Sequence, residues 1–397
     1  MTEWKECTIA DIGTVVGGAT PSTKDSSNYD GGEIAWITPK DLSNYDDRYI
    51  SHGERNITEK GLNGCSAQLM PKHSVLFTSR APIGYVAIAD GEVCTNQGFK
   101  SVVPNENTDY LFLYYLLRYN KDKIEGLGSG TTFKEVSGST MKGIKVRVPT
   151  TLSAQKAIGR FLDSIDCKIE QNRKINKNLL QQAEAIYKAW FCDRSVENGS
   201  THWPNTTIGD ITSLVVRGIT PKYNDDADQI VINQKCIRNH MVDLTLARRH
   251  FPKVITEKWL MQGDLLINST GEGTLGRTAQ VWFVPNNLTV DSHVTIVRPR
   301  SVALRNYIGL WGLTHEAEIE SLHTGSTGQT ELPRERVKAM ELPLPDESTL
   351  SRFNELITPM TQAIVKNQHE NIRLGELRDA LLPRLMSGEL DASDIDL

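Results

Sequence analysis

The chain has 397 residues, 39% of them hydrophobic and 23% charged, a composition that excludes collagen-like and low-complexity proteins. The length indicates two or three domains. The net charge of −5 excludes nucleic-acid binding through overall charge alone, so basic residues would have to gather locally or a partner would have to supply phosphate contacts.

The cysteines and the N-terminal segment indicate a cytoplasmic protein. No Cys-x-x-Cys pair occurs, so we expect neither a zinc site nor a disulfide framework but reduced thiols. Residues 1–7 are charged and lack the apolar core of a signal peptide. The sequence contains no run of about 18 apolar residues, so it predicts no membrane-spanning helix. The six dispersed cysteines are Cys7, Cys65, Cys94, Cys167, Cys192 and Cys236.

The chain repeats itself. The pattern Trp-x-x-x-Thr-Ile-x-Asp-Ile occupies residues 4–12 and recurs at 203–211. Because the matches keep their order along both halves, we expect one fold used twice with diverged surfaces. Further matches are Gly-x-Thr-Pro at 18–21 and 218–221, and Gly/Ser/Thr-rich loops at 128–132 and 324–328.

Each half begins with a globular part that reads as mixed α/β. Strand-like runs at 74–78 and 264–267 lie between turn residues. Residues 110–118 are apolar at helical spacing.

Each half ends with a long amphipathic helix. An apolar seam runs from Ile158 to Trp190 in steps that alternate between four and three, and it recurs at an offset of 195 from Phe353 to Leu385. Nearly five heptads in each helix predict a coiled coil. The alternative, two helices on separate cores, would bury asparagines without partners. These asparagines are Asn172, Asn176, Asn367 and Asn371.

The asparagines also predict the direction and register of the coiled coil. In an antiparallel pair, with opposed residue numbers summing to 543, Asn172 meets Asn371 and Asn176 meets Asn367. Trp190 then meets Phe353 in an outer layer. In the one imperfect layer Ile165 faces Arg378, whose guanidinium must reach solvent or an acid. A parallel pair would instead bring Asn172 to Asn367.

The expected fold class is therefore α+β, with two similar mixed α/β domains joined by two long helices that form an antiparallel coiled coil. The first helix is the only net-basic segment. The four segments are a first globular domain at 1–150, a first helical spacer at 151–195, a second globular domain at 196–346, and a second helical spacer with a C-terminal tail at 347–397.

Motifs of self-contained catalysis are missing from the sequence. It has no Asn/Asp-Pro-Pro-Tyr/Phe motif, no Walker A loop and no His-Glu-x-x-His. The segment 271–276 matches Gly-x-Gly-x-x-Gly, but strand-like residues follow it where a dinucleotide site needs a helix. It predicts a hairpin turn.

Polar residues gather in loops at matching places in both halves. Singly, each is most simply a solvated loop residue, but Arg, Lys, Gln and Thr can read base edges or hold phosphates. Arg80 and Arg277 are expected in matching turns. The candidates for DNA binding are Thr20, Lys24, Lys40, Arg80, Thr132, Lys134, Arg217, Thr220, Lys222, Lys235, Arg277 and Gln329.

The whole pattern resembles the DNA-specificity subunit of type I restriction–modification systems. The resemblance rests on the order domain, helix, domain, helix, on the two Gly-x-Thr-Pro elements, and on the helix segments 155–191 and 381–390. It implies that each globular domain is a target-recognition domain for one half of a bipartite sequence in double-stranded DNA. The helices would set the spacing and dock two modification subunits.

The resemblance also implies where the chemistry lies. The modification subunits would bind S-adenosylmethionine and methylate adenine, and restriction subunits, which are motor-nucleases using ATP and Mg, would join them for bacterial defence. This chain would carry no catalytic residue and no cofactor or metal. Two alternatives are a two-domain scaffold that binds peptides or glycans, and an enzyme with twinned active sites. The enzyme would need the same polar triad in both halves, and the aligned halves offer none.

Overall fold

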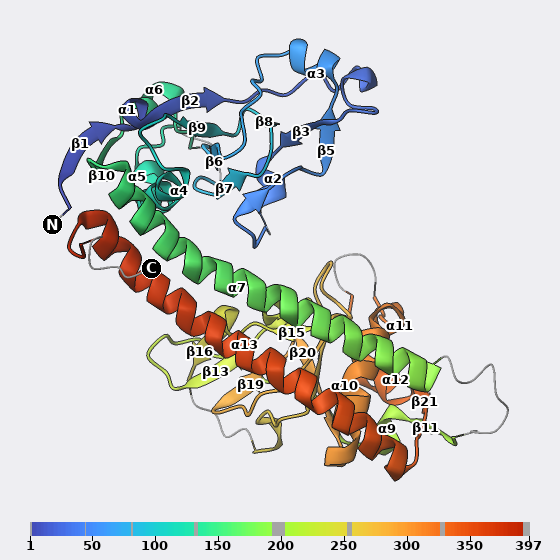
Figure 1. Cartoon of the computed structure of the whole chain (residues 1–397). Coiled ribbons are helices and arrows are strands. Elements are labelled where there is room, and N and C mark those ends of the chain that lie inside the picture. Colours follow the sequence, from blue (N-terminus) through green and yellow to red (C-terminus); the bar gives the residue numbers. More distant parts are fainter. Residues whose placement is uncertain are drawn as a thin grey trace. The chain divides into compact units, whose positions relative to one another are not determined.

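The computed structural model describes residues 2–43, 45–80, 82–130, 134–192, 203–251, 256–325 and 330–391. By their internal contacts these form two units (Figure 1). Unit 1 consists of residues 1–172 and 370–397, and unit 2 of residues 173–369. Each unit holds one globular domain and part of each long helix. No helix among the described residues is long and apolar enough to span a membrane.

The globular domain of unit 1 contains a five-stranded sheet of order β2-β9-β6-β7-β4, a three-stranded sheet β5-β3-β8, and the pair β1-β10. Its elements are β1 (Trp4–Thr8), α1 (Ile9–Ile12), β2 (Gly13–Gly17), η1 (Ser26–Asn28), β3 (Ile34–Ile37), α2 (Pro39–Leu42), β4 (Tyr49–Ile50), β5 (Arg55–Ile57), α3 (Glu59–Asn63), β6 (Val75–Phe77), β7 (Val86–Ala89), β8 (Val93–Thr95), β9 (Lys100–Pro104), α4 (Tyr110–Tyr119), α5 (Lys121–Gly126), α6 (Gly138–Gly143) and β10 (Lys145–Pro149).

The globular domain of unit 2 contains sheets of order β12-β20-β17-β18 and β16-β13-β19, and the pairs β11-β21 and β14-β15. Its elements are β11 (Asn205–Thr207), α9 (Ile208–Ile211), β12 (Thr212–Arg217), β13 (Gln229–Ile232), η3 (Gln234–Cys236), β14 (Ile237–Arg238), β15 (Met241–Val242), η4 (Leu244–Leu246), β16 (Arg248–His250), η5 (Thr256–Lys258), β17 (Leu265–Asn268), β18 (Thr278–Gln280), β19 (Leu288–Val290), β20 (Val294–Pro299), η6 (Val302–Leu304), α10 (Arg305–Thr314), α11 (Glu316–Ser321), α12 (Arg334–Lys338) and β21 (Glu341–Pro343).

The two domains share one topology. The parallel pair β3–β8 places Ala35 beside Val93, and the parallel pair β13–β19 places Ile230 beside Leu288, both at the offset of 195. Strands β6 and β17 are buried on both faces, which explains their uninterrupted apolar sequences. The predicted repeat and mixed α/β class are thus confirmed, as is the helix predicted at 110–118, which is α4.

The long helices contribute to the core of both domains. Helix α7 (Leu152–Tyr187) continues into a π-helix (Lys188–Cys192), and α13 spans Glu347–Ser387. In unit 1, Ile158 of α7 and Leu385 of α13 lie in the core of the first domain. In unit 2, Tyr187 of α7 and Phe353 of α13 lie in the core of the second. Toward its C-terminal end α7 buries Leu180 more deeply than the predicted seam residue Leu179, because this end also packs on the second domain.

The asparagines pair within each unit. In unit 1, Asn172 Nδ2 donates to Asn371 Oδ1 over 2.9 Å. In unit 2, Asn367 Nδ2 donates to Asn176 Oδ1 over 2.8 Å, and the rings of Trp190 and Phe353 lie 5.8 Å apart. These are the pairs that the 543 register predicts, and they make the helices antiparallel in both units.

The arginine in the imperfect layer meets an acid. Arg378 Nη1 lies 2.5 Å from Asp166 Oδ1, and Asp166 is only 5% exposed. The same carboxylate accepts a hydrogen bond from the Tyr115 hydroxyl at 2.8 Å and lies 3.3 Å from Arg118 Nη1. A buried carboxylate needs such partners because its desolvation is otherwise costly.

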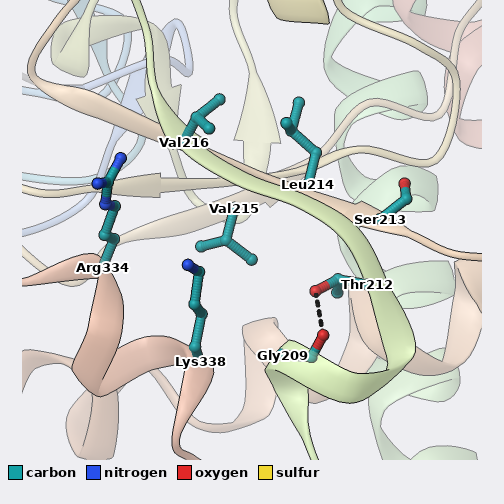
Figure 2. A pocket seen from close by; sticks show the side chains of 8 residues that line it. All are labelled: Gly209, Thr212, Ser213, Leu214, Val215, Val216, Arg334 and Lys338. Atoms are coloured by element: carbon teal, nitrogen blue, oxygen red, sulfur yellow. Dashed lines mark hydrogen bonds between the residues drawn. The ribbon is translucent and has the colours of Figure 1, made fainter.

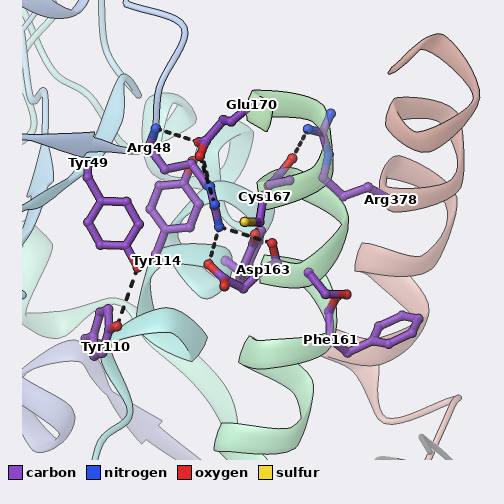
Figure 3. A network of polar contacts seen from close by, with 12 residues as sticks. Arg48, Tyr49, Tyr110, Tyr114, Phe161, Asp163, Cys167, Glu170 and Arg378 are labelled. Carbon is purple, nitrogen blue, oxygen red and sulfur yellow. Dashed lines mark hydrogen bonds and ion pairs between the residues drawn. The ribbon is translucent and has the colours of Figure 1, made fainter. Parts of the chain in front are cut away.

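A second charged cluster joins the first domain to α7 (Figure 3). Arg48, which precedes β4 and is 6% exposed, binds both oxygens of Glu170 at 2.8 and 3.0 Å. Its Nη1 also donates to the Asp163 carboxylate. The fork of Arg48 therefore fixes β4 against α7 at two residues that lie about two helical turns apart.

In unit 2 a histidine joins the globular domain to α7. His240, in the β14–β15 turn, places Nδ1 2.9 Å from Glu184 on α7 and Nε2 3.2 Å from Glu316 on α11. The hydrogen bond to Glu184, followed by that to Glu316, raises the pKa of His240 to about 9. The imidazole is therefore protonated and doubly paired at neutral pH.

Unit 1 is built from segments distant in the sequence. The Thr2 backbone N–H and hydroxyl donate to the two carboxylate oxygens of Asp391, over 2.7 and 2.6 Å. Arg147 on β10 donates to the carbonyl of Ser387 at the end of α13. The strand pair β1-β10 is thereby attached to the last turn of α13.

Replacing one asparagine of a pair should lower the free energy of unfolding more than replacing an exposed asparagine. We expect Asn172→Ala to lower the free energy of unfolding by about 1–3 kcal/mol, because Asn371 loses its partner in a buried layer. A cycle with Asn371→Ala should give a coupling energy above about 0.5 kcal/mol. Urea denaturation measures both, with the exposed Asn178→Ala as control. Additive single effects would contradict the pairing.

Stability should also depend on the protonation of His240. Its folded pKa of about 9 lies above the ordinary value of 6.5, so its contribution is complete below pH 6.5 and is lost as the pH rises through 9. We expect the parent to lose about 1–3 kcal/mol more than His240→Gln between pH 6.5 and 10. Thermal unfolding across this range measures the difference, and parallel pH profiles would refute the assignment.

Candidate nucleic-acid interface

In unit 1 several candidate segments are hydrogen-bonded to the loop 96–98 between β8 and β9. We call this loop the hub of unit 1. The Asn96 N–H donates to the carbonyl of Ile37, which lies just before helix α2 and its Lys40. The Thr20 hydroxyl donates to the Gln97 side chain. The Ser79 N–H donates to the carbonyl of Gly98 over 2.7 Å, which places the turn of Arg80 beside the same loop.

In unit 2 the loop 291–293, between β19 and β20, has the same position. The Asp291 N–H donates to the carbonyl of Ile232, and the Ser269 N–H donates to the carbonyl of His293 over 2.8 Å. Thr270 Oγ1 lies 2.7 Å from His293 Nδ1. The second domain thus assembles the same group of loops from different side chains.

The Gly-x-Thr-Pro elements approach these hubs too closely for any side chain at the glycine. A Cβ atom on Gly18 would lie 2.1 Å from the carbonyl oxygen of Asn96, and one on Gly218 would lie 2.0 Å from that of Val290. Both contacts are far inside van der Waals distance. The recurring glycine is therefore required by close backbone approach, which fixes the exposed residues Thr20 and Thr220 beside their hubs.

The Gly/Ser/Thr loops are closed at their base by backbone pairs. Ser129 and Glu135 exchange two hydrogen bonds of 3.0 and 2.9 Å, and Thr324 and Glu331 exchange two of 2.8 and 2.9 Å. The candidates Thr132 and Gln329, which belong to these loops, lie outside the described residues.

Three of the candidate cations are ion-paired. Lys40 Nζ lies 2.6 Å from Glu54, and this hydrogen bond raises the pKa of Lys40 although its side chain is 77% exposed. Arg80 pairs with Glu135 and Arg217 with Glu331. These side chains are not simply solvated, and an incoming phosphate would compete with a carboxylate for each.

The remaining candidate cations lie on the surface. Lys222 lies over the Phe251 ring with 5.1 Å between Nζ and the ring centroid. Lys235 lies in η3, whose N-cap Asn233 accepts from the Lys235 N–H, and Lys40 of α2 takes the equivalent place in unit 1. The exposed cations are Lys24, Lys134, Lys222, Lys235 and Arg277.

Arg80 and Arg277 lie in matching turns, as expected, because their turns join the equivalent strand pairs β6–β7 and β17–β18, but the two arginines do not occupy equivalent positions within those turns. Thr78 pairs with Tyr85 through its backbone, whereas Asn268 pairs with Arg277, so Arg277 corresponds to Tyr85. Arg80 corresponds to Thr270, since each forms a backbone bridge to the glutamate after its Gly/Ser/Thr loop. The physical reason is a turn two residues longer in unit 2.

The glycine-rich segment 271–276 is that longer turn. It connects the antiparallel strands β17 and β18, and Gly271, Gly273 and Gly276 have positive φ angles. The predicted hairpin turn is confirmed.

Four polar residues of these loop groups escaped the sequence analysis: Gln97, Glu135, His293 and Glu331. The first and third hold neighbouring loops by side chain, and the glutamates close the Gly/Ser/Thr loops. A signal for the glutamates was present, because each directly precedes a buried aliphatic residue after the repeated loop.

A shallow depression of about 370 Å³ beside β12 offers no catalytic chemistry (Figure 2). Its cations, Arg334 and Lys338 of α12, lie 3.3 and 3.1 Å from Glu335 Oε1. Among the described residues, no carboxylate, thiol or imidazole lines it. Within the described ranges no group of three or more His, Cys, Asp or Glu residues could hold a metal ion.

Alanine at the two close-approach glycines should disturb the loop groups. We expect Gly18→Ala and Gly218→Ala each to lower the free energy of unfolding by about 1–3 kcal/mol, because backbone carbonyls must move. Gly91→Ala is the matched control, since a Cβ there meets nothing within 4 Å. Urea denaturation measures all three variants, and equal stability of Gly18→Ala and Gly91→Ala would contradict the contact.

Comparison with known proteins supplies a family for this arrangement. Residues 1–181 match the type I restriction modification DNA specificity domain. The chain is 33% identical to the type I restriction enzyme MjaIX specificity subunit of Methanocaldococcus jannaschii, over 99% of this chain and 95% of that protein. It is 27% identical to the EcoR124I/EcoR124II specificity subunit of Escherichia coli over 41% of each chain.

A solved structure has the same fold. It is the type I restriction–modification S subunit from M. genitalium, which aligns with a TM-score of 0.61 over 97% of this chain and 96% of that chain, at 16% sequence identity. This likeness covers both domains and both long helices.

Proposed function

Because the chain belongs to the DNA-specificity subunits of type I restriction–modification systems, we propose that its two loop groups are the surfaces that read the two halves of a bipartite DNA target. The chain is the non-catalytic, sequence-recognising component. This assignment replaces the peptide or glycan scaffold as the interpretation of the two repeated domains.

One observation carries the location of the interface: the same group of loops is built twice around equivalent hubs. In both units the Gly-x-Thr-Pro element, the segment that leads into α2 or η3, and the closed Gly/Ser/Thr loop meet at one place. Exposed cations and amides there differ between the units, as two readers of different base sequences require.

The partners follow from the family. DNA and other restriction–modification subunits are its partners, and we infer two modification subunits docked on the α7–α13 pair, with restriction subunits added. S-adenosylmethionine, ATP and Mg would be bound by those subunits. The dispersed cysteines, Cys94 and Cys236 of which are buried, support a reducing cytoplasmic location.

The decisive experiment is methylation by the reconstituted complex. The purified chain should modify no DNA, whereas the chain with its modification subunits should methylate one bipartite sequence, mapped by methylome sequencing of cells with and without the gene. Methylation by the chain alone, or a target unchanged on its deletion, would contradict the function.

The two halves of the target should be separable by mutation. We expect Lys134→Ala to alter base choice in one half-site and Arg277→Ala in the other, each by about 1–3 kcal/mol if the side chain reads a base. The exposed Lys5→Ala on β1 is the control. Competition binding with half-site variants measures this, and uniform weakening on every sequence would make the residue a phosphate contact.

A further inference from the structure

We propose that Glu135 and Glu331 are matched positioning residues, each holding the base of one recognition loop and one arginine in the geometry that reads DNA. This inference rests on the proposed function of the loop groups. It adds two acidic residues to surfaces whose ligand is itself an anion.

The backbone of each glutamate closes its loop in the same way. Glu135 exchanges two backbone hydrogen bonds with Ser129. The N–H of the next residue, Val136, donates to the carbonyl of Ser79 over 2.9 Å. Glu331 is likewise followed by Leu332, whose N–H donates to the carbonyl of Ser269 over 2.8 Å. Each glutamate therefore lies where its loop joins the hub.

The side chain of each glutamate then pairs with an arginine from another segment. Arg80 Nε lies 2.9 Å from Glu135 Oε2, and Arg217 Nη1 lies 2.7 Å from Glu331 Oε1. Arg217 also donates to the carbonyl of Leu332 over 3.0 Å, so one guanidinium binds both the carboxylate and the backbone beside it.

A second cation lies beside Glu135, and it comes from a different strand than the cation beside Glu331. Lys100 of β9 lies 3.5 Å from Glu135 Oε1 and faces Gly17 across the β2–β9 ladder. In unit 2 the equivalent ladder position places Arg217 of β12 opposite Thr295. The strand cation thus lies on β9 in unit 1 and on β12 in unit 2, whereas the glutamate has the same position in both, as expected if the position of the carboxylate matters more than the source of its partner.

Stability alone is a poor reason for these pairs. The side chains of Arg80 and Glu135 are 46% and 34% exposed, and those of Arg217 and Glu331 are 27% and 57% exposed, so solvent weakens the attraction. A carboxylate also repels DNA phosphate. It is useful if it directs the arginine and opposes unspecific phosphate contacts.

Neutralising the glutamate separates these roles. In Glu135→Gln the arginine is released to bind phosphates of any sequence, so affinity for unrelated DNA should rise and its salt dependence steepen by about 1 in the log–log slope. Discrimination at the half-site read by unit 1 should fall about 5- to 10-fold, with the other half-site unchanged. Glu331→Gln should give the mirror result.

The experiment uses the full chain assembled with its modification subunits. Binding is measured on the cognate site, on DNA altered in either half-site, and on unrelated DNA at several salt concentrations. Glu135→Asp, which keeps the charge, should retain the parental salt slope. The matched control is Glu106→Gln, an exposed glutamate between β9 and α4. Thermal unfolding of each variant identifies a loss of folding.

Each outcome decides the inference. Loss confined to one half-site, with stronger unspecific binding, supports it. Equal weakening on all DNA, a loss at both half-sites, unchanged discrimination, or the same effect from Glu106→Gln overturns it while leaving the proposed function intact. A parental complex without half-site discrimination overturns the proposed function itself, and the inference with it.

Discussion

In each unit the globular domain and the two long helices form a common hydrophobic core, and the placement of the loops depends on that core. Ile158 and Leu385 are completely or almost completely buried in the core of unit 1, as are Phe353 and Tyr187 in that of unit 2. A helix that contacted its partner only along one apolar seam could rotate or slip against it. Here the seam widens into the domain at each end, so a shift of the helix would expose apolar surface.

Charged and amide groups add selectivity to this apolar contact. The Asn172–Asn371 pair, the Asp166–Arg378 pair and the fork of Arg48 are all satisfied in one register. Such buried polar groups contribute little net stability, but each would lose its partner in another register. The helix pair therefore has one arrangement within each unit, and the loop groups are held on a rigid base.

The sequence predicted features governed by regular spacing and failed where loop length changed. The helix seams, the asparagine pairing and the repeat depend on periodicity or a constant offset, and both can be read directly from the spacing of residues in the sequence. The equivalence of Arg80 and Arg277 failed because a two-residue insertion shifts the turn. The ion pairs of Arg80 and Arg217 could not be predicted, because each joins segments more than 50 residues apart.

The attachment of Thr2 to Asp391 has a consequence for the order of folding. Unit 2 occupies one continuous stretch, residues 173–369, and all its core residues have been synthesised once that stretch is complete. The core of unit 1 lacks Leu382, Leu385 and Met386 until the last part of α13 emerges from the ribosome. The contacts of unit 1 span nearly the whole chain, so the entropic cost of closing the loops between them is larger than in unit 2. During synthesis the first domain made is thus the last one closed.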